Sequence, residues 1–184
     1  MTLQDDLWFA TDRCLIGGTW VAPQSGALLD LVDPSDGAHL CQVARGDARD
    51  IDAAVKAAQG ALHGPWGDMT AAERGRILTR IGQLVLERVD TLARLEARDV
   101  GKPLTQARND AIALARYMEF YGGAADKVHG QTIPFQQGYT VYTLRQPHGV
   151  TGHIVPWNYP MQIIGRSVGA ALAMGNATVL KPAE

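Results

Sequence analysis

The stretch that decides the fold is GVTGHIVPWNYPMQIIGRSVGAALAMGNATVLKPAE, residues 149–184. Its hydrophobic pattern predicts a buried strand that ends at Val155, a helix over 161–174 and a second strand over 177–180. A strand, a helix and a strand within about 30 residues form a βαβ unit, whose strands run parallel and whose crossover is right-handed. Ligands of such α/β sheets bind beyond the carboxyl ends of the strands.

The turn after the first strand is a candidate site. Pro156 and Pro160 bracket it and restrict its backbone, so its side chains are held in place. Asn158 lies between them and offers two amide hydrogens near the start of the helix, where a fixed donor can stabilise an oxyanion. Asparagine is also a common helix N-cap, and on the local sequence alone capping is the more frequent role. Both interpretations of Asn158 stay open at this level.

The second strand is followed by Lys181 and Glu184, two opposite charges three residues apart. A lysine can donate to ribose hydroxyls or to phosphate, and a carboxylate can accept from a ribose 2′-hydroxyl. A solvated surface ion pair is the commoner explanation of two such residues. The chain has no GxGxxG after a strand, no Walker A loop and no GxSxG turn. The residues alone therefore indicate an α/β ligand-binding domain with a candidate anion or nucleotide site.

Charge and composition exclude several classes of protein. The 184 residues carry 17 Lys and Arg against 19 Asp and Glu, a formal net charge of −2. This balance argues against binding to nucleic acid or to an anionic membrane, which would need a basic excess. Cys14, Cys41 and five histidines show no metal-ligand spacing, so no metal site is expected. The apolar stretch 161–174 is too short to span a bilayer and no secretory signal is recognised, so we expect a soluble protein of the cytoplasm.

Shorter strands are expected before the βαβ unit. Turn chemistry at Pro23–Gly26 predicts a hairpin between the first two of them. Later, β-prone residues alternate on both sides of Gly138. The predicted strands cover 14–21, 27–32, 40–44, 131–135 and 139–145.

Four helices with an apolar face are expected between residues 47 and 121. The second begins at Thr70, whose side chain forms a capping box with that of Glu73, and Asp90 is expected to cap the third. Their predicted ends are Gly64–Pro65 for the first, Gly101–Pro103 for the third and Gly122–Gly123 for the last. The buried stripe of the second is expected at Ile77, Ile81, Leu84 and Val85.

Two blocks of this sequence resemble the NAD(P)-dependent aldehyde dehydrogenase superfamily. They are GVxGxIVPWNYP at 149–160 and ALAxGNxxVLKPAE at 171–184. IGGTW at 16–20 and GKP at 101–103 fit the same family in the same order, so the resemblance extends over nearly the whole chain.

The resemblance implies an α/β fold, namely a partial Rossmann-like cofactor-binding domain of the aldehyde dehydrogenase type with an N-terminal hairpin, helices and a β-arm. Residues 1–127 are expected to form the hairpin and the helical part of the cofactor domain. Residues 128–148 resemble the family's oligomerisation arm, and 149–184 its first βαβ unit.

The resemblance also assigns roles to residues. Asn158 matches the family asparagine that holds the oxyanion, which favours catalysis over capping. Lys181 and Glu184 match the pair that contacts the adenosine ribose, and an acidic residue there should repel a 2′-phosphate, so NAD is expected in preference to NADP. The segment expected to line the nicotinamide and pyrophosphate consists of Ile154, Val155, Pro156 and Trp157.

The implied reaction is the NAD(P)-dependent oxidation of an aldehyde to a carboxylic acid by a homodimer or homotetramer. In the family a cysteine thiolate attacks the aldehyde, hydride passes to the nicotinamide, and a glutamate activates the hydrolytic water. Cys14 and Cys41 match neither position, so the 184 residues are expected to be an N-terminal part that lacks both groups and is inactive alone. The alternative is a catalytically inert truncated module with a residual nucleotide-binding or protein-interaction role.

One departure from the family bears on the substrate. Arg166 and Ser167 stand where many relatives carry an aromatic residue and a lysine. Spacings of four and three place Tyr159, Ile163 and Arg166 on one helix face. Because the family's substrate tunnel lies on that side, Arg166 is a candidate for selecting aldehydes that bear a carboxylate or another polar group. A surface salt bridge explains Arg166 equally well.

Overall fold

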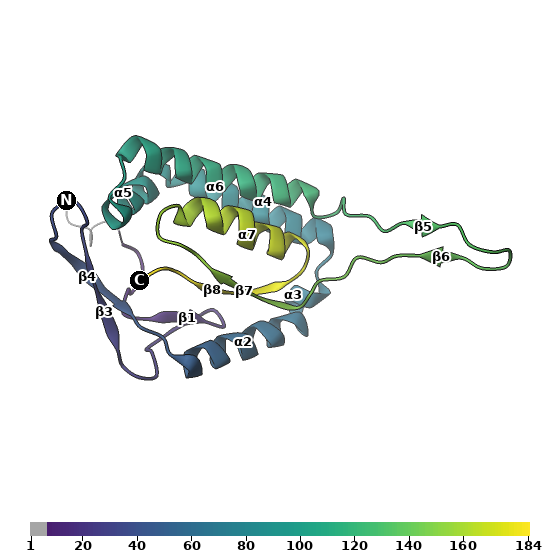
Figure 1. The fold of residues 1–184 in the computed structure, drawn as a ribbon, viewed down its shortest axis with the longest axis horizontal. Helices are drawn as coiled ribbons and strands as arrows, with labels where there is room; N and C mark the ends of the chain where they lie inside the picture. Colours follow the sequence, from purple (N-terminus) through teal and green to yellow (C-terminus); the bar gives the residue numbers. More distant parts are fainter. Residues whose placement is uncertain (1–6) are drawn as a thin grey trace.

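The computed structural model describes residues 7–184, and the βαβ unit lies at its centre (Figure 1). Strand β7 (Val150–Ile154) leads into helix α7 (Pro160–Ala173), which returns the chain to strand β8 (Ala177–Lys181). The two strands pair in parallel. The predicted α/β class and the βαβ unit are confirmed.

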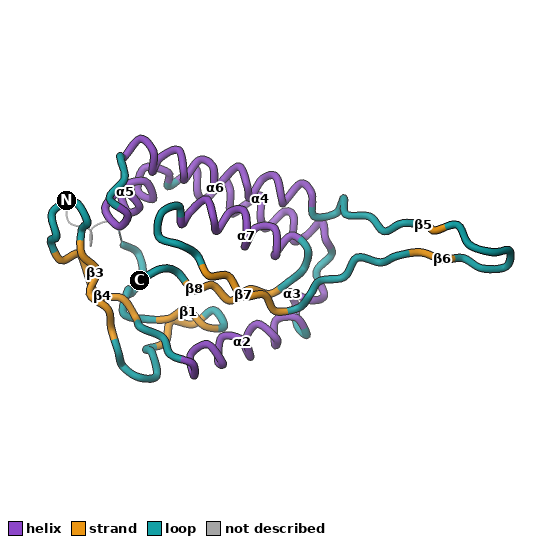
Figure 2. Tube along the Cα trace, in the orientation of Figure 1, coloured by secondary structure: helices purple, strands orange, loops and turns teal. Residues whose placement is uncertain are grey.

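Helices lie on both sides of the β7–β8 pair (Figures 1 and 2). Helix α7 contacts one side and α2 (Ala48–Leu62) the other, next to the short α3 (Pro65–Asp68). Helix α6 (Leu104–Ala124) packs on α7, on α4 (Ala71–Glu87) and on α5 (Val89–Val100). None of the helices within the described residues is long and apolar enough to cross a membrane.

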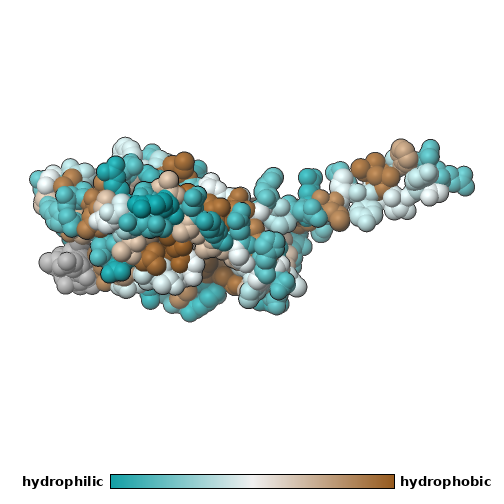
Figure 3. All heavy atoms as spheres, turned by 90° about the horizontal axis from the view of Figure 1, so that it is seen from below, coloured by the Kyte–Doolittle hydropathy of each residue, from teal (hydrophilic) through white to brown (hydrophobic). Residues whose placement is uncertain are grey.

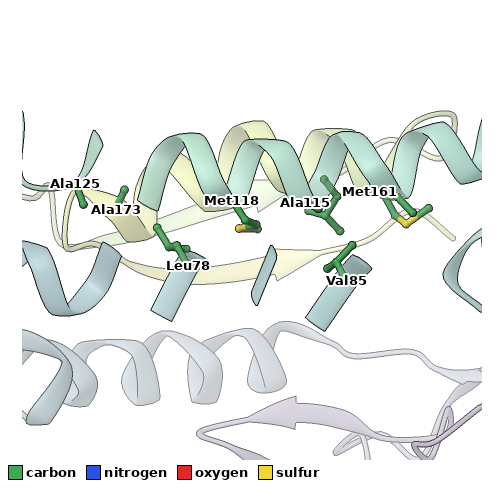
Figure 4. Close-up of a cluster of buried hydrophobic side chains, with 9 residues drawn as sticks. Leu78, Val85, Ala115, Met118, Ala125, Met161 and Ala173 are labelled. Atoms are coloured by element: carbon green, nitrogen blue, oxygen red, sulfur yellow. The ribbon is translucent and has the colours of Figure 1, made fainter. Parts of the chain in front are cut away.

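The hydrophobic core lies where α4, α6 and α7 meet (Figure 4). Leu78 of α4 is fully buried there. The backbones of α4 and α6 come close, since a Cβ at Gly75 would lie only 2.4 Å from the carbonyl oxygen of Gly122. The other buried members of the cluster are Val85, Ala111, Leu114, Ala115, Met118, Ala125, Met161 and Ala173.

The buried face of α4 agrees with the predicted one at Val85 and differs from it at two other positions. Ile77 and Leu84 are expected inside but are each 38% exposed. The buried positions are Gly75, Leu78, Gly82 and Val85. The two glycines share a helix face and admit the backbone of α6, so close packing selects this stripe instead of the bulkier one beside it.

The N-terminal strands form two separate hairpins. The four strands are β1 (Cys14–Ile16), β2 (Thr19–Val21), β3 (Leu28–Val32) and β4 (His39–Ala44). β1 pairs with β2, and β3 pairs with β4. The expected single strand over 14–21 is therefore wrong, because Gly17 and Gly18 have φ angles of +58° and +78° and form the tight turn that antiparallel strands prefer. The turn at Pro23–Gly26 forms, but it connects the two hairpins and closes neither, so the hairpin predicted there is wrong.

The predicted helix starts are confirmed at two positions and wrong at a third. Asp47 and Thr70 cap α2 and α4, each through a reciprocal capping box. Asp90 does not cap α5, whose N-cap is Arg88 without a side-chain hydrogen bond. Its carboxylate instead accepts a hydrogen bond from Nε of Arg108 at 2.9 Å. Asp90 thus binds a residue of another helix instead of capping its own.

Of two glycine positions predicted to end a helix, one is confirmed and the other is wrong. Gly101 ends α5 in the left-handed conformation, with φ of +75°, as predicted. Gly122 and Gly123 do not end α6, which continues to Ala124. Gly122 is used for close packing, since a Cβ there would lie 2.7 Å from the carbonyl oxygen of Gly75.

A two-stranded arm projects from the body between α6 and β7 (Figures 1 and 3). Its strands, β5 (Thr132–Ile133) and β6 (Val141–Tyr142), pair antiparallel and are shorter than predicted. Apolar and polar side chains alternate along its surface, and the rings of Phe135 and Tyr139 meet edge to face while both stay exposed.

Candidate cofactor and oxyanion site

The two candidate segments leave the sheet at the same edge. Ile154 pairs with Lys181 at the last position of the parallel ladder, and the Val155 amide donates to the carbonyl oxygen of Lys181 at 2.9 Å. Val155 is only 2% exposed, whereas the preceding Ile154 is 83% exposed. The turn at 156–160 and residues 182–184 therefore start side by side, as the parallel pairing requires.

Asn158 lies in an exposed turn and does not cap α7. The N-cap residue is Tyr159, and no side chain accepts a hydrogen bond from the first turn of the helix. Within residues 7–184 the Asn158 side chain has no hydrogen-bond partner. The capping interpretation is thus wrong, and the amide is available to a ligand. Trp157 beside it is also exposed.

Lys181 and Glu184 form the surface ion pair that their charges suggest. Nζ of Lys181 lies 2.8 Å from Oε1 of Glu184, and the two side chains are 44% and 75% exposed. The hydrogen bond from Lys181, together with its positive charge, holds the pKa of Glu184 below its usual value. An exposed pair of this kind contributes little to stability. Both groups remain accessible to a ligand at the sheet edge.

Behind this turn lies a buried charged cluster that the sequence pattern does not reveal. Nζ of Lys102 is 2.9 Å from Oε1 of Glu96 and 2.5 Å from Oδ2 of Asp110, and the three side chains are at most 8% exposed. Burial raises the pKa of Glu96, an effect that Lys102 partly offsets. Burial alone lowers the pKa of Lys102, but hydrogen bonds to Asp110 and Glu96 outweigh it and leave that pKa raised. Spacings of six and eight residues across a helix break match no helix face, so only the tertiary structure shows the cluster.

The two cysteines lack the features of a nucleophile. Burial raises the pKa of Cys14, and the nearby charge of Asp50 adds to the effect. Burial also raises the pKa of Cys41. Both thiols therefore stay protonated near neutral pH. They are unreactive in that form, because the thiolate is the nucleophile.

Arg166 is exposed on α7 and makes no ion pair within residues 7–184. The surface salt bridge that would explain this residue is therefore absent from the described structure. Ile163 on the same face is half-buried and Tyr159 is 44% exposed. The guanidinium is thus free to meet an anionic group on this face of the helix.

Comparison with known proteins gives a consistent result. The profile of the aldehyde dehydrogenase family matches residues 20–184. The chain is 47% identical to the mitochondrial aldehyde dehydrogenase family 2 member B4 of Arabidopsis thaliana over 94% of its own length. It superimposes on a Burkholderia cenocepacia structure assigned to the aldehyde dehydrogenases with a TM-score of 0.92 and 62% identity, over 93% of this chain.

Solved neighbours carry different cofactor descriptions. An NAD+ complex of aldehyde dehydrogenase from Bacillus cereus matches with a TM-score of 0.90 and 39% identity, over 93% of this chain and 35% of the neighbour. An NADP-dependent enzyme from E. coli matches with the same TM-score and 38% identity, over 94% of this chain and 36% of the neighbour. The chain spans about a third of its relatives, 32% of the Arabidopsis protein and 36% of the Burkholderia one. The chain belongs to the aldehyde dehydrogenase family.

Proposed function

We propose that this chain supplies the oxyanion donor and part of the cofactor site of an NAD-dependent enzyme that oxidises an aldehyde to a carboxylic acid. The observation that carries the proposal is the common sheet edge, where Ile154 pairs with Lys181 and the segments 156–160 and 182–184 begin. Ligands of α/β sheets bind at this edge. Membership of the family supplies the class of reaction.

In this proposal Asn158 donates an amide hydrogen to the aldehyde oxygen as that oxygen becomes negatively charged. Its side chain is exposed and has no partner within the described residues. Pro156 and Pro160 restrict the backbone on both sides of it. A donor that is already oriented need not reorganise during the reaction, which makes its stabilisation of the oxyanion effective.

The residues at the end of β7 suit the nicotinamide end of a dinucleotide. Ile154 and Trp157 are apolar yet 83% and 66% exposed, so they offer uncovered surface against which a flat ring can pack. Pro156 is exposed and completes the proposed lining beside the pyrophosphate, whereas Val155 is 2% exposed and supports this lining from beneath. When bound, the nicotinamide accepts the hydride.

The residues after β8 suit the adenosine ribose. Lys181 and Glu184 are exposed, and together they offer a donor and an acceptor for ribose hydroxyls. The lowered pKa of Glu184 keeps its carboxylate charged near neutral pH. A charged carboxylate repels a 2′-phosphate, so we propose that NAD is preferred over NADP.

The 184 residues alone are not expected to oxidise aldehydes, because burial raises the pKa of the thiols of Cys14 and Cys41 and both cysteines lie in strands of the N-terminal hairpins. The proposed reaction therefore concerns the complete enzyme that carries these residues. The alternative, an inert module that binds nucleotide or protein, predicts the same weak cofactor contacts without any role for Asn158 in a reaction.

Amide NMR spectra of the 184-residue chain titrated with NAD test the proposed binding site. Chemical-shift changes are expected for the amides of Ile154, Val155 and Trp157 and for those of Lys181, Ala183 and Glu184. Changes confined to other parts of the molecule, or no changes at millimolar NAD, would contradict the proposal.

A kinetic comparison separates the enzyme from the inert module. In the complete enzyme, Asn158→Ala is expected to lower kcat by about 10²–10³-fold, the usual loss for one oxyanion donor. The NMR response of the Ala variant to NAD at 181–184 should stay that of the wild type. If NAD binds as described but the variant keeps the full rate, the module alternative is favoured.

The proposal includes assembly of the complete protein into a homodimer or homotetramer through the arm at 128–148. Phe135, Tyr139 and Leu144 are 68%, 64% and 69% exposed there, and a second copy would cover them. Sedimentation of the complete protein measures its mass, and Phe135→Ser is expected to shift it toward the monomer. A wild-type monomer would contradict this part of the proposal.

A further inference from the structure

The Lys102 cluster contacts the residues that follow Asn158. Asp110 binds Lys102 through Oδ2, and its other oxygen, Oδ1, accepts a hydrogen bond from Nε2 of Gln162 at 2.6 Å. The ammonium of Lys102 also lies 4.4 Å from the ring centroid of Tyr159. Tyr159 is the N-cap residue of α7 and Gln162 lies in its first turn. The cluster thus holds the start of α7 at two points.

The other end of the turn is anchored by the sheet. Val155 is buried, and its amide donates to the carbonyl oxygen of Lys181. Only residues 156–158 separate this anchor from Tyr159. Within the described part of the chain, Asn158 makes no side-chain hydrogen bond of its own, so its position depends on these two anchors.

The cluster is well suited to this task. Its three charged side chains are almost completely buried, and each is bound to at least one of the others. Removing one member of a buried charged set leaves the others unpaired, so the geometry is strongly enforced. Lys102 lies between α5 and α6, two helices packed into the body, and therefore links the turn to the rigid part of the molecule.

We propose that Lys102, Asp110 and Gln162 are positioning residues that orient the Asn158 amide for the reacting aldehyde oxygen. This inference rests on the proposed function, in which Asn158 is the oxyanion donor. An oxyanion donor displaced by about 1 Å can lose up to about 10²-fold in rate, so a support for the turn acts directly on kcat. The supports are not expected to change the affinity for NAD at Lys181 and Glu184.

The test is a double-mutant cycle in the complete enzyme. Gln162→Ala and Lys102→Met are each expected to lower kcat by about 10- to 100-fold while KM for NAD stays within about twofold. In the Asn158→Ala background the same changes should have little further effect, because the amide that they position is gone. A loss that is equally large in both backgrounds would overturn the inference.

Three further variants separate positioning from folding. Tyr159→Phe keeps the ring that faces Lys102 and should retain most of the rate that Tyr159→Leu loses. Arg108→Gln breaks the exposed pair between α6 and Asp90 of α5 without touching the turn, and should leave kcat unchanged. If Lys102→Met does not fold, Gln162→Ala and Tyr159→Leu decide the question, and full activity in both would overturn the inference.

The outcomes distinguish this inference from the proposed function. If Asn158→Ala itself retains the wild-type kcat, both the proposed function and this inference are contradicted. If kcat falls in Asn158→Ala but stays at the wild-type value in folded Gln162→Ala and Tyr159→Leu, only the positioning role is contradicted. Hydrogen exchange in the 184-residue chain gives a readout besides activity, since Gln162→Ala should speed exchange of the Ile163 amide, which donates to the carbonyl oxygen of Tyr159 at 2.9 Å, and leave that of Val155 unchanged.

Discussion

Gly75 of α4 and Gly122 of α6 face each other so closely that neither can carry a side chain. A Cβ at Gly75 would lie 2.4 Å from the carbonyl oxygen of Gly122, and one at Gly122 would lie 2.7 Å from that of Gly75. This contact sets the spacing of the two helices that support α7. The position of the candidate site thus depends on a backbone contact far from it.

Gly75→Ala is expected to destabilise the fold by about 1–3 kcal/mol, because the new methyl group forces two packed helices apart. Gly123→Ala, in the same helix as Gly122, meets nothing within 4 Å and should stabilise by about 0.5–1 kcal/mol through helix propensity. Urea unfolding of the two variants measures both effects. Equal stabilities would contradict the importance of the contact.

Glu96 is expected to make stability depend on pH. Its folded-state pKa is raised by burial, so the folded protein binds this proton more tightly than the unfolded chain does. The contribution of Glu96 to the free energy of unfolding is therefore present below the unfolded pKa and is lost as pH rises through the folded pKa. The free energy of unfolding of the wild type minus that of Glu96→Gln should fall as pH rises from the unfolded pKa of a glutamate, about 4.3, through the raised folded pKa. A difference that grows with pH would mean that Lys102 outweighs burial.

Glu184→Gln is expected to change cofactor preference in the complete enzyme. Removing the carboxylate removes repulsion of a 2′-phosphate, so the ratio of kcat/KM for NADP to that for NAD should rise by about tenfold. Glu184→Gln removes the charge but keeps a side-chain oxygen that can accept the hydrogen bond from Lys181. Lys181→Met is the complementary variant, since it removes the partner and keeps the carboxylate. If the ratio of kcat/KM for NADP to that for NAD is unchanged in Glu184→Gln, residue 184 does not distinguish the two cofactors.

The 184-residue chain should bind NAD only weakly. It offers one sheet edge with two candidate segments, and much of the proposed lining is exposed to solvent. Isothermal calorimetry is expected to give a Kd well above 1 μM, which corresponds to less than about 8.2 kcal/mol of binding free energy. A submicromolar Kd would contradict this prediction and show that the chain holds a nearly complete cofactor site.

Arg166→Leu is expected to change substrate selectivity in the complete enzyme. The exposed guanidinium has no ion-pair partner within residues 7–184, so it can pair with a carboxylate on the aldehyde. The variant should lose about tenfold in kcat/KM for acidic aldehydes and little for neutral ones, while Arg166→Lys should lose less. Equal selectivity in the wild type and Arg166→Leu would exclude this role.

Much of the site follows from local sequence signals. The apolar run before Pro156, the prolines of the turn and the second strand after Gly175 predict the βαβ unit, and parallel pairing then brings Lys181 beside Ile154. Asp47 and Thr70 cap their helices because a capping box needs only residues three positions apart. These features depend on residues within one helix turn or within one βαβ unit, so the sequence alone determined them.

Other features were decided by the tertiary structure. Leu78 is buried instead of Ile77 because α6 packs against α4 at Gly75 and Gly82 of α4. The residues near Leu78 in the sequence do not indicate that α6 packs there. The cluster around Lys102 joins charges from α5 and α6 to a side chain of α7, and the pairing becomes visible only when the three helices are packed. Burial and long-range pairing are properties of the assembled fold, because they depend on which surfaces meet and not on the order of residues along one element.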